Sequence, residues 1–229
     1  MRAIPAERWF GVYPAIVTDN QDPEGIGRVR VRLPWAPDAG GGGLTKSGHH
    51  EAWARLATLT AGRNRGSWFL PDLDDEVLVA FEAGHPARPL VVGALWNGQD
   101  TPPATADSSN TVKLLRTRGG SELQFDDTTG AETVHVRTAA GQSIELATGG
   151  GGAVRVSDGH GNSVTLQASG VTVASSAPVR VQGSTITLDA ASVNVKSAIL
   201  KCDGVIQGTT LIVGHVVASS YTPGAGNIW

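Results

Sequence analysis

The sequence predicts an all-β protein built from two parts, a compact barrel followed by a rod of short strands. Only 17% of the residues are charged, against about 25% in a typical domain, and 30 residues are glycine, which favours turn-rich β structure. Nine of the twelve aromatic residues precede residue 100, where a three-dimensional core has room for large rings. Later in the chain, apolar pairs recur every 7 residues, as in stacked β-helix rungs: Val179 and Val181, Ile186 and Leu188, Val193 and Val195.

Length, charge and cysteine content narrow the possible classes of protein. The chain has 229 residues and a net charge of -3, which gives no general attraction to nucleic acid or anionic lipid. The single cysteine, Cys202, excludes an intramolecular disulfide and fits synthesis in a reducing compartment. No apolar run approaches the roughly 20 residues that span a bilayer, and the N-terminus lacks the apolar core of a secretory signal. We therefore expect synthesis in the cytoplasm without use of the general secretory route.

The first hundred residues predict a small closed barrel, most simply of the OB type. Strand-like segments are separated by turn-forming residues: 12–18, 28–33, 53–60, 68–70, 76–81 and 89–95. We expect Trp53, Phe69, Phe81 and Trp96 in the barrel core. Residues 34–50 contain four consecutive glycines, which predicts a flexible loop that includes His49 and His50.

The second half predicts a ladder of short strands without helix. Residues 113–116 and 122–125 read as one hairpin, and residues 134–137 and 143–146 as the next. This gives four regions: an OB barrel over 1–100, a linker over 101–110, a β-helical rod over 111–217 and a tail over 218–229. A single chain leaves strand edges unpaired along such a rod, which favours pairing with other chains.

Several motifs in the first hundred residues resemble one family when they are taken together in order. They are D-P-x-x-x-G-R-V-x-V from Asp22, W-A-R from Trp53, G-x-x-F-x-P-x-x-x-D-E-V-L-V-x-F from Gly66, and PLVVGALWNG from Pro89. The chain is similar to the central spikes of contractile tails, namely phage baseplate assembly protein V and the VgrG spike of type VI secretion. The resemblance covers the barrel through its motifs and the rod through its architecture.

This resemblance implies a homotrimer with an OB barrel at the baseplate hub and a C-terminal intertwined β-helix. It implies a hub protein and a PAAR-repeat tip protein or effector as partners, transient contact with the target membrane, and no nucleic acid. It also places the protein in a phage-like particle that is delivered to the target cell envelope. Since the chain carries neither a lysozyme domain nor an effector domain, we expect a spike that is not an enzyme.

The candidate site residues concern assembly rather than chemistry. Arg28, Arg30 and Arg32 line one face of a strand and are candidates for contact with the hub. The tail is a candidate for docking the tip protein or for capping the last rung, through Tyr221, Asn227, Ile228 and Trp229. Three copies of His215 around a threefold axis are the one candidate metal site. The alternative is that His215 is an ordinary packed or solvated side chain. We expect no catalytic residue and no cofactor, because no motif for nucleophilic, metal or phosphate chemistry is present.

A binding or degrading protein is the alternative. An OB barrel could hold an oligonucleotide or glycan, and a β-helix could cleave polysaccharide. The former requires aromatic residues interleaved with basic ones on the sheet face, and the latter requires clustered carboxylates with sugar-stacking rings along the rod. The rod has one phenylalanine and no tryptophan before its tail, so the sequence favours the spike.

Overall fold

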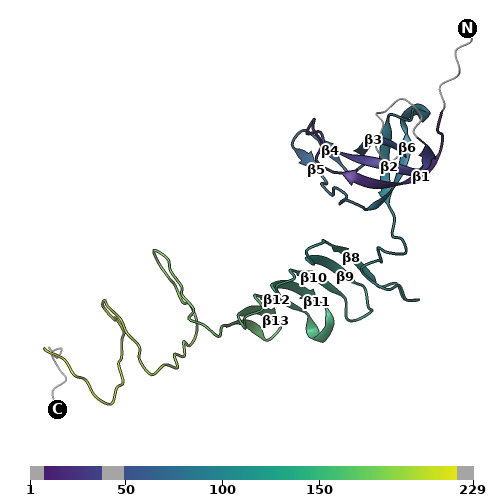
Figure 1. The fold of residues 1–229 in the computed structure, drawn as a ribbon. Coiled ribbons are helices and arrows are strands. Elements are labelled where there is room, and N and C mark those ends of the chain that lie inside the picture. The colour runs from purple at the N-terminus through teal and green to yellow at the C-terminus, as the bar shows by residue number, and fades with distance from the viewer. Residues whose placement is uncertain (1–7, 38–48, 221–229) are drawn as a thin grey trace, which may run out of the picture. The chain divides into compact units, whose positions relative to one another are not determined.

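The computed structural model describes residues 8–37 and 49–220, and its regular structure is almost entirely β. The strands and the two short 3-10 helices are drawn in Figure 1. In the first hundred residues they are β1 (Val12–Asp19), β2 (Arg28–Pro37), β3 (His49–Leu56), β4 (Ala61–Gly62), β5 (Arg65–Gly66), β6 (Glu76–Phe81), η1 (Glu82–Gly84) and β7 (Pro89–Ala94). After them come β8 (Val112–Arg116), β9 (Glu122–Asp126), β10 (Thr133–Arg137), β11 (Ser143–Ala147), η2 (Gly149–Gly151), β12 (Ala153–Ser157), β13 (Ser163–Gln167) and β14 (Gly170–Ala174).

Five strands close into a barrel in the order β1-β2-β3-β7-β6, which confirms the predicted all-β barrel. All neighbouring strands are antiparallel except β3 and β7, which pair in parallel. Alternate residues point inward, as the pattern of β2 predicts, and Val29, Val31 and Leu33 are fully buried. Val77 and Val79 of β6 meet them in one core. The barrel is therefore a fold that a single chain can complete.

The prediction for His49 and His50 is wrong. Both lie on β3, because β2 continues to Pro37 and Leu33 pairs with His50 across the two strands. The His50 side chain is buried, its Nε2 lies 3.1 Å from the Pro86 carbonyl oxygen, and its ring meets the edge of Trp9. The loop between these strands is thus shorter than residues 34–50, and its residues 38–48 lie outside the described part.

The predicted aromatic core is also only partly correct. Phe81 is buried and Trp53 is half-buried, but Phe69 and Trp96 are 69% and 68% exposed. No strand forms over residues 68–70, where the chain instead passes along the surface between the β4–β5 hairpin and β6. These rings are excess apolar surface on the barrel of a single chain.

The loop between β1 and β2 is held by one carboxylate. Asp22 accepts hydrogen bonds from the backbone N–H groups of Glu24, Ile26 and Arg28, and it forms an ion pair of 2.7 Å with the Arg28 guanidinium. The Arg28 contact, joined by these backbone donors, lowers the pKa of Asp22 far below its usual range. The turn at Asp22 and Pro23 is thus ordered by this carboxylate, and we call these contacts the Asp22 clamp.

Strands β8 to β14 form a separate seven-stranded antiparallel sheet in which each strand pairs with the next along the chain. The predicted hairpins are confirmed as β8–β9 and β10–β11. The remaining described residues, 177–220, form no helix or strand within one chain, and all of them are exposed. The 7-residue rhythm predicted for this segment therefore has no partner strands in a single copy.

Candidate assembly surface

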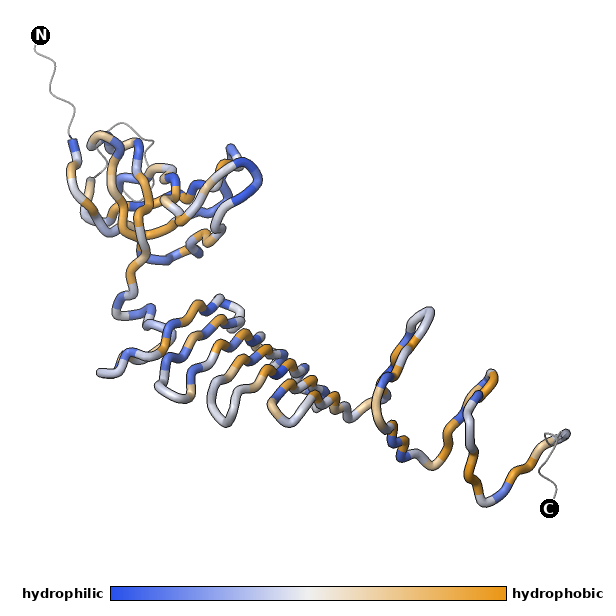
Figure 2. The backbone as a smooth tube through the Cα atoms, turned by 180° about the vertical axis from the view of Figure 1, so that it is seen from behind, coloured by the Kyte–Doolittle hydropathy of each residue, from blue (hydrophilic) through white to orange (hydrophobic). Residues whose placement is uncertain are grey.

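One face of the seven-stranded sheet is apolar from edge to edge. Because directly paired residues point to the same side, the strand register aligns two rows across the sheet. The first row is Leu115, Leu123, Val136, Ile144, Val156, Val164 and Val173. The second row is Phe125, Val134, Leu146, Val154, Leu166 and Val171, and it begins at Lys113. Figure 2 shows this alternation as orange and blue segments along the strands.

Within residues 8–37 and 49–220, no segment of the chain covers these apolar rows. Eleven of their side chains are between 36% and 68% exposed. Fully burying one such side chain contributes about 1.5–3 kcal/mol, so an open face of this size forfeits a large part of the stability available to it. A contiguous apolar surface on this scale marks an interface with another protein surface.

The opposite face is polar and carries its own ion-pair network. Arg116, Glu122 and Arg137 align across β8, β9 and β10. Both guanidinium groups lie 2.6 Å from carboxylate oxygens of Glu122, which is 4% exposed. The charge of this buried carboxylate is balanced by two arginines of the same sheet, so this face does not need a partner as the apolar face does.

The segment 177–220 continues the apolar character without any sheet. Its large apolar side chains range from 51% to fully exposed. From Val193 onward they recur every six residues, at Ile199, Val205, Leu211 and Val217. A rung this short cannot bury its apolar side chains alone and depends on neighbouring rungs or chains.

The turns along one edge of the sheet repeat the same design. The connections 117–121, 138–142 and 158–162 each contain a glycine at positive φ: Gly120, Gly141 and Gly161. Each is closed by a backbone hydrogen bond, from Thr117 to Ser121, Thr138 to Gln142 and Asp158 to Asn162. Along the other edge, the connections shorten from 127–132 to 148–152 and then 168–169.

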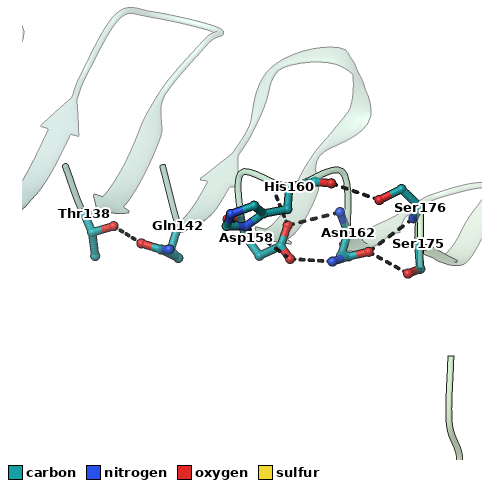
Figure 3. Close-up of polar contacts among 7 residues, drawn as sticks. All are labelled: Thr138, Gln142, Asp158, His160, Asn162, Ser175 and Ser176. Atoms are coloured by element: carbon teal, nitrogen blue, oxygen red, sulfur yellow. Dashed lines mark hydrogen bonds and ion pairs between the residues drawn. The ribbon is translucent and has the colours of Figure 1, made fainter. Parts of the chain in front are cut away.

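The turn 158–162 also secures the end of the sheet (Figure 3). Asp158 accepts hydrogen bonds from the Asn162 side chain at 2.5 Å and from the backbone N–H of His160 at 2.7 Å, and these donors lower its pKa. The Asn162 side-chain oxygen Oδ1 in turn accepts from the Ser175 hydroxyl and the Ser176 N–H. His160 thus belongs to a structural turn whose side-chain network reaches the end of β14.

The three arginines predicted to face a hub lie on the outer face of β2, where two of them form ion pairs with residues of the barrel itself. Arg28 pairs with Asp22 and lies 5.6 Å from the centre of the Trp53 ring, and Arg30 lies 3.0 Å from Glu51. For Arg32, the buried Nε has no hydrogen-bond partner among the described residues. Two of the three cations are therefore committed to carboxylates of the same chain.

The other predicted site residues are not brought together. His215 is exposed, and within residues 8–37 and 49–220 no group of three or more His, Cys, Asp or Glu side chains could hold a metal ion. The four tail candidates, Tyr221, Asn227, Ile228 and Trp229, lie outside the described residues. No helix in the described part is long and apolar enough to cross a membrane.

Comparison with known families places both parts of the chain. Residues 13–96 match a type VI secretion system/phage-baseplate injector OB domain. Residues 134–201 match the phage baseplate V C-terminal trimerisation domain, which includes most of the apolar rows and the first half of the segment without strands. The open apolar face therefore coincides with a trimerisation domain, and this supports a homotrimer.

Several curated relatives of the chain are spike proteins of type VI secretion systems. The chain is 33% identical over 116 residues to the type VI secretion system spike protein VgrG3 of Vibrio cholerae, covering 48% of this chain and 11% of that protein. It is 34% identical over 142 residues to spike protein VgrG4b of Pseudomonas aeruginosa, covering 58% of this chain and 17% of that protein. With VgrG1a of the same organism the identity is 29%, over 48% of this chain and 18% of that protein. The chain thus spans less than a fifth of the length of these relatives.

Proposed function

Because this chain belongs to the family of phage baseplate V and VgrG-like spike proteins, we propose that it is the central spike of a contractile injection machine. In this role the barrel is mounted on the baseplate hub, and sheath contraction drives the rod into the target envelope. The machine is a phage tail, a tailocin or an extracellular injection system, and the chain is made in the cytoplasm before it joins the particle.

The observation that carries the proposal is the apolar face that one chain leaves open. Three copies that turn their apolar rows inward exclude water from all of them, while the polar faces with Glu122 and its arginines remain outside. Segments 177–220 of three chains supply one another with strand partners, so their backbone N–H and C=O groups are satisfied. A dry, hydrogen-bonded rod of this kind has the stiffness and slow unfolding that a puncturing device requires.

In this role the chain is not an enzyme. Its action is mechanical, and the chemistry on the target side belongs to a tip protein or effector carried at the C-terminal end. The rod itself meets the target membrane only transiently.

The first test is the mass of the full-length protein in solution. Light scattering should give about three times 23.6 kDa, and the trimer should persist through a brief exposure to SDS at room temperature. A well-folded particle with the mass of one chain would contradict the proposal, because the apolar rows would then be stable in water.

A further inference from the structure

The barrel has an apolar groove of its own, distinct from the rows of the sheet. Four large side chains that line it are strongly exposed: Ile26 at 63%, Leu59 at 93%, Trp68 at 73% and Phe69 at 69%. The groove has a volume of about 1000 Å³ and lies between the β1–β2 loop and the segment that carries β4 and β5. Four such side chains around one hollow exceed the scattered apolar residues of an ordinary surface.

This groove is built to hold its shape. Gly27 has φ +81°, and a Cβ at this position would lie 3.0 Å from the Trp68 ring, so glycine lets the ring rest against the loop. The Asp22 clamp fixes that loop from the other side. Across the groove, the Thr58 hydroxyl donates to the Ser67 carbonyl at 2.8 Å, and the Ser67 N–H donates to Thr60 at 3.1 Å. The exposed rings are therefore presented in fixed positions, as at a binding surface.

A second exposed ring on the same barrel has the chemistry to fill the groove. Trp96 is 68% exposed and does not line the groove. It lies next to the acidic turn of residues 72–76. The Leu95 N–H donates to the Glu76 carbonyl oxygen, and the Asn97 side chain donates to the Glu76 carboxylate. That turn also contains Asp74, which is exposed, whereas the hairpin at the groove carries the exposed Arg63 and Arg65. The ring with acidic neighbours thus complements an apolar groove with a basic rim.

The homotrimer of the proposed function brings these two surfaces together. β7 ends at Ala94 and β8 begins at Val112, so each barrel is tethered to the trimerisation region by a segment that reaches at most about 60 Å. Three barrels on such tethers experience one another at roughly millimolar effective concentration. Two different complementary patches on each copy are what a head-to-tail contact needs, and such contacts close into a ring when the rotation from one copy to the next allows it.

We propose that in the homotrimer the groove of each barrel is occupied by Trp96 of the neighbouring copy, with Arg63 and Arg65 facing the acidic turn of that copy. The three barrels then form a closed ring. This inference rests on the proposed function, because it requires three tethered copies.

The test measures whether the groove is covered in the assembled protein. In the full-length chain with Cys202→Ala, a single cysteine is introduced as Leu59→Cys in the groove or as Ala87→Cys on an exposed turn outside it. Reaction with a polyethylene-glycol maleimide is followed by gel shift, with the mass of each variant checked by light scattering. We expect Leu59→Cys to react about tenfold more slowly than Ala87→Cys in the trimer.

A second substitution identifies the occupant. Trp96→Ala should raise the labelling rate of Leu59→Cys to that of Ala87→Cys without changing the mass, whereas Trp96→Phe should keep the groove protected. Equal rates for the two cysteines in a particle of three chains would overturn the inference and leave the groove open for another protein. Protection that survives Trp96→Ala would overturn it as well, because the occupant would then be another segment. The mass of a single chain would instead overturn the homotrimer itself.

Discussion

The barrel and the rod use the same sequence pattern with opposite results. Val29 and Val31 in β2 alternate with arginines, and Val154 and Val156 in β12 alternate with polar residues in the same way. In the barrel, five strands close on themselves and bury the valines completely. In the sheet, seven strands run as an open meander, and the equivalent valines are 36% and 44% exposed. Alternation therefore tells which side of a strand is apolar, whereas closure of the sheet decides whether one chain can cover that side.

The largest expected effect is a charge placed on the apolar rows. Val164 and Thr165 are adjacent on β13 and point to opposite faces. Val164→Asp places one unpaired carboxylate per chain in the interface. Each carboxylate should destabilise the trimer by about 3–5 kcal/mol, so the variant should not form the trimer. Thr165→Asp adds the same charge to the polar face and should leave the mass unchanged in light scattering. Equal behaviour of the two variants would show that the apolar rows are not the interface.

A substitution that creates a cavity in the barrel distinguishes the stability of the barrel from the association of the rod. Val31 is fully buried, and Val31→Ala should lower the stability of the barrel by about 1–3 kcal/mol through lost packing. Its unfolding midpoint in a denaturant titration should be independent of protein concentration. Dissociation of the rod should instead depend on concentration, since it separates chains. A loss of trimer in Val31→Ala would mean that the barrel, rather than the rod, controls assembly.

Removing the ion-pair network on the polar face should lower the stability of the rod moderately. Glu122→Gln removes the charge that both Arg116 and Arg137 contact and leaves two cations side by side. We expect a loss of about 1–3 kcal/mol in the thermal stability of the rod, with the trimer retained at room temperature. Glu145→Gln, on the same face but without a described ion pair, is the matched control. A change in oligomeric state in Glu122→Gln would place this face in the interface.

The smallest expected effect concerns the Asp22 clamp and depends on pH. Because the pKa of Asp22 is lowered in the folded protein, its carboxylate stabilises the barrel above its ordinary pKa of 3.8, and this contribution is lost as the pH falls. Asp22→Asn should therefore melt at a lower temperature than the wild type at pH 7. The difference between the two melting temperatures should begin to shrink as the pH drops below about 4, and it should vanish only when the pH falls through the lowered pKa of Asp22. A difference that persists unchanged at pH 3 would show that the charge is not what holds the loop.

The sequence was most informative where local patterns determine structure. The pairing of residues 113–116 with 122–125 follows from alternation and an intervening Gly-Gly turn, and both are local features. The prediction for His50 is wrong because a glycine run precedes it, while its position on β3 is fixed by pairing with Leu33 from the far side of the loop. The sequence predicts Phe69 and Trp96 in the core because large rings usually fill cores. Their exposure depends on whether surfaces beyond one chain cover them, which no local pattern contains.

The segment 177–220 has a consequence for how the protein is made. A chain whose rod folds only beside two others has no monomeric native state in which to wait, so each newly synthesised copy is exposed to proteases until it meets its partners. The yield of spikes should then rise with about the third power of chain concentration when expression is low. Once three chains have wound together in such a rod, exchanging one chain requires unwinding all three. Two alleles expressed in the same cell should form mixed spikes only during synthesis, and their ratio in each particle is then fixed for its lifetime.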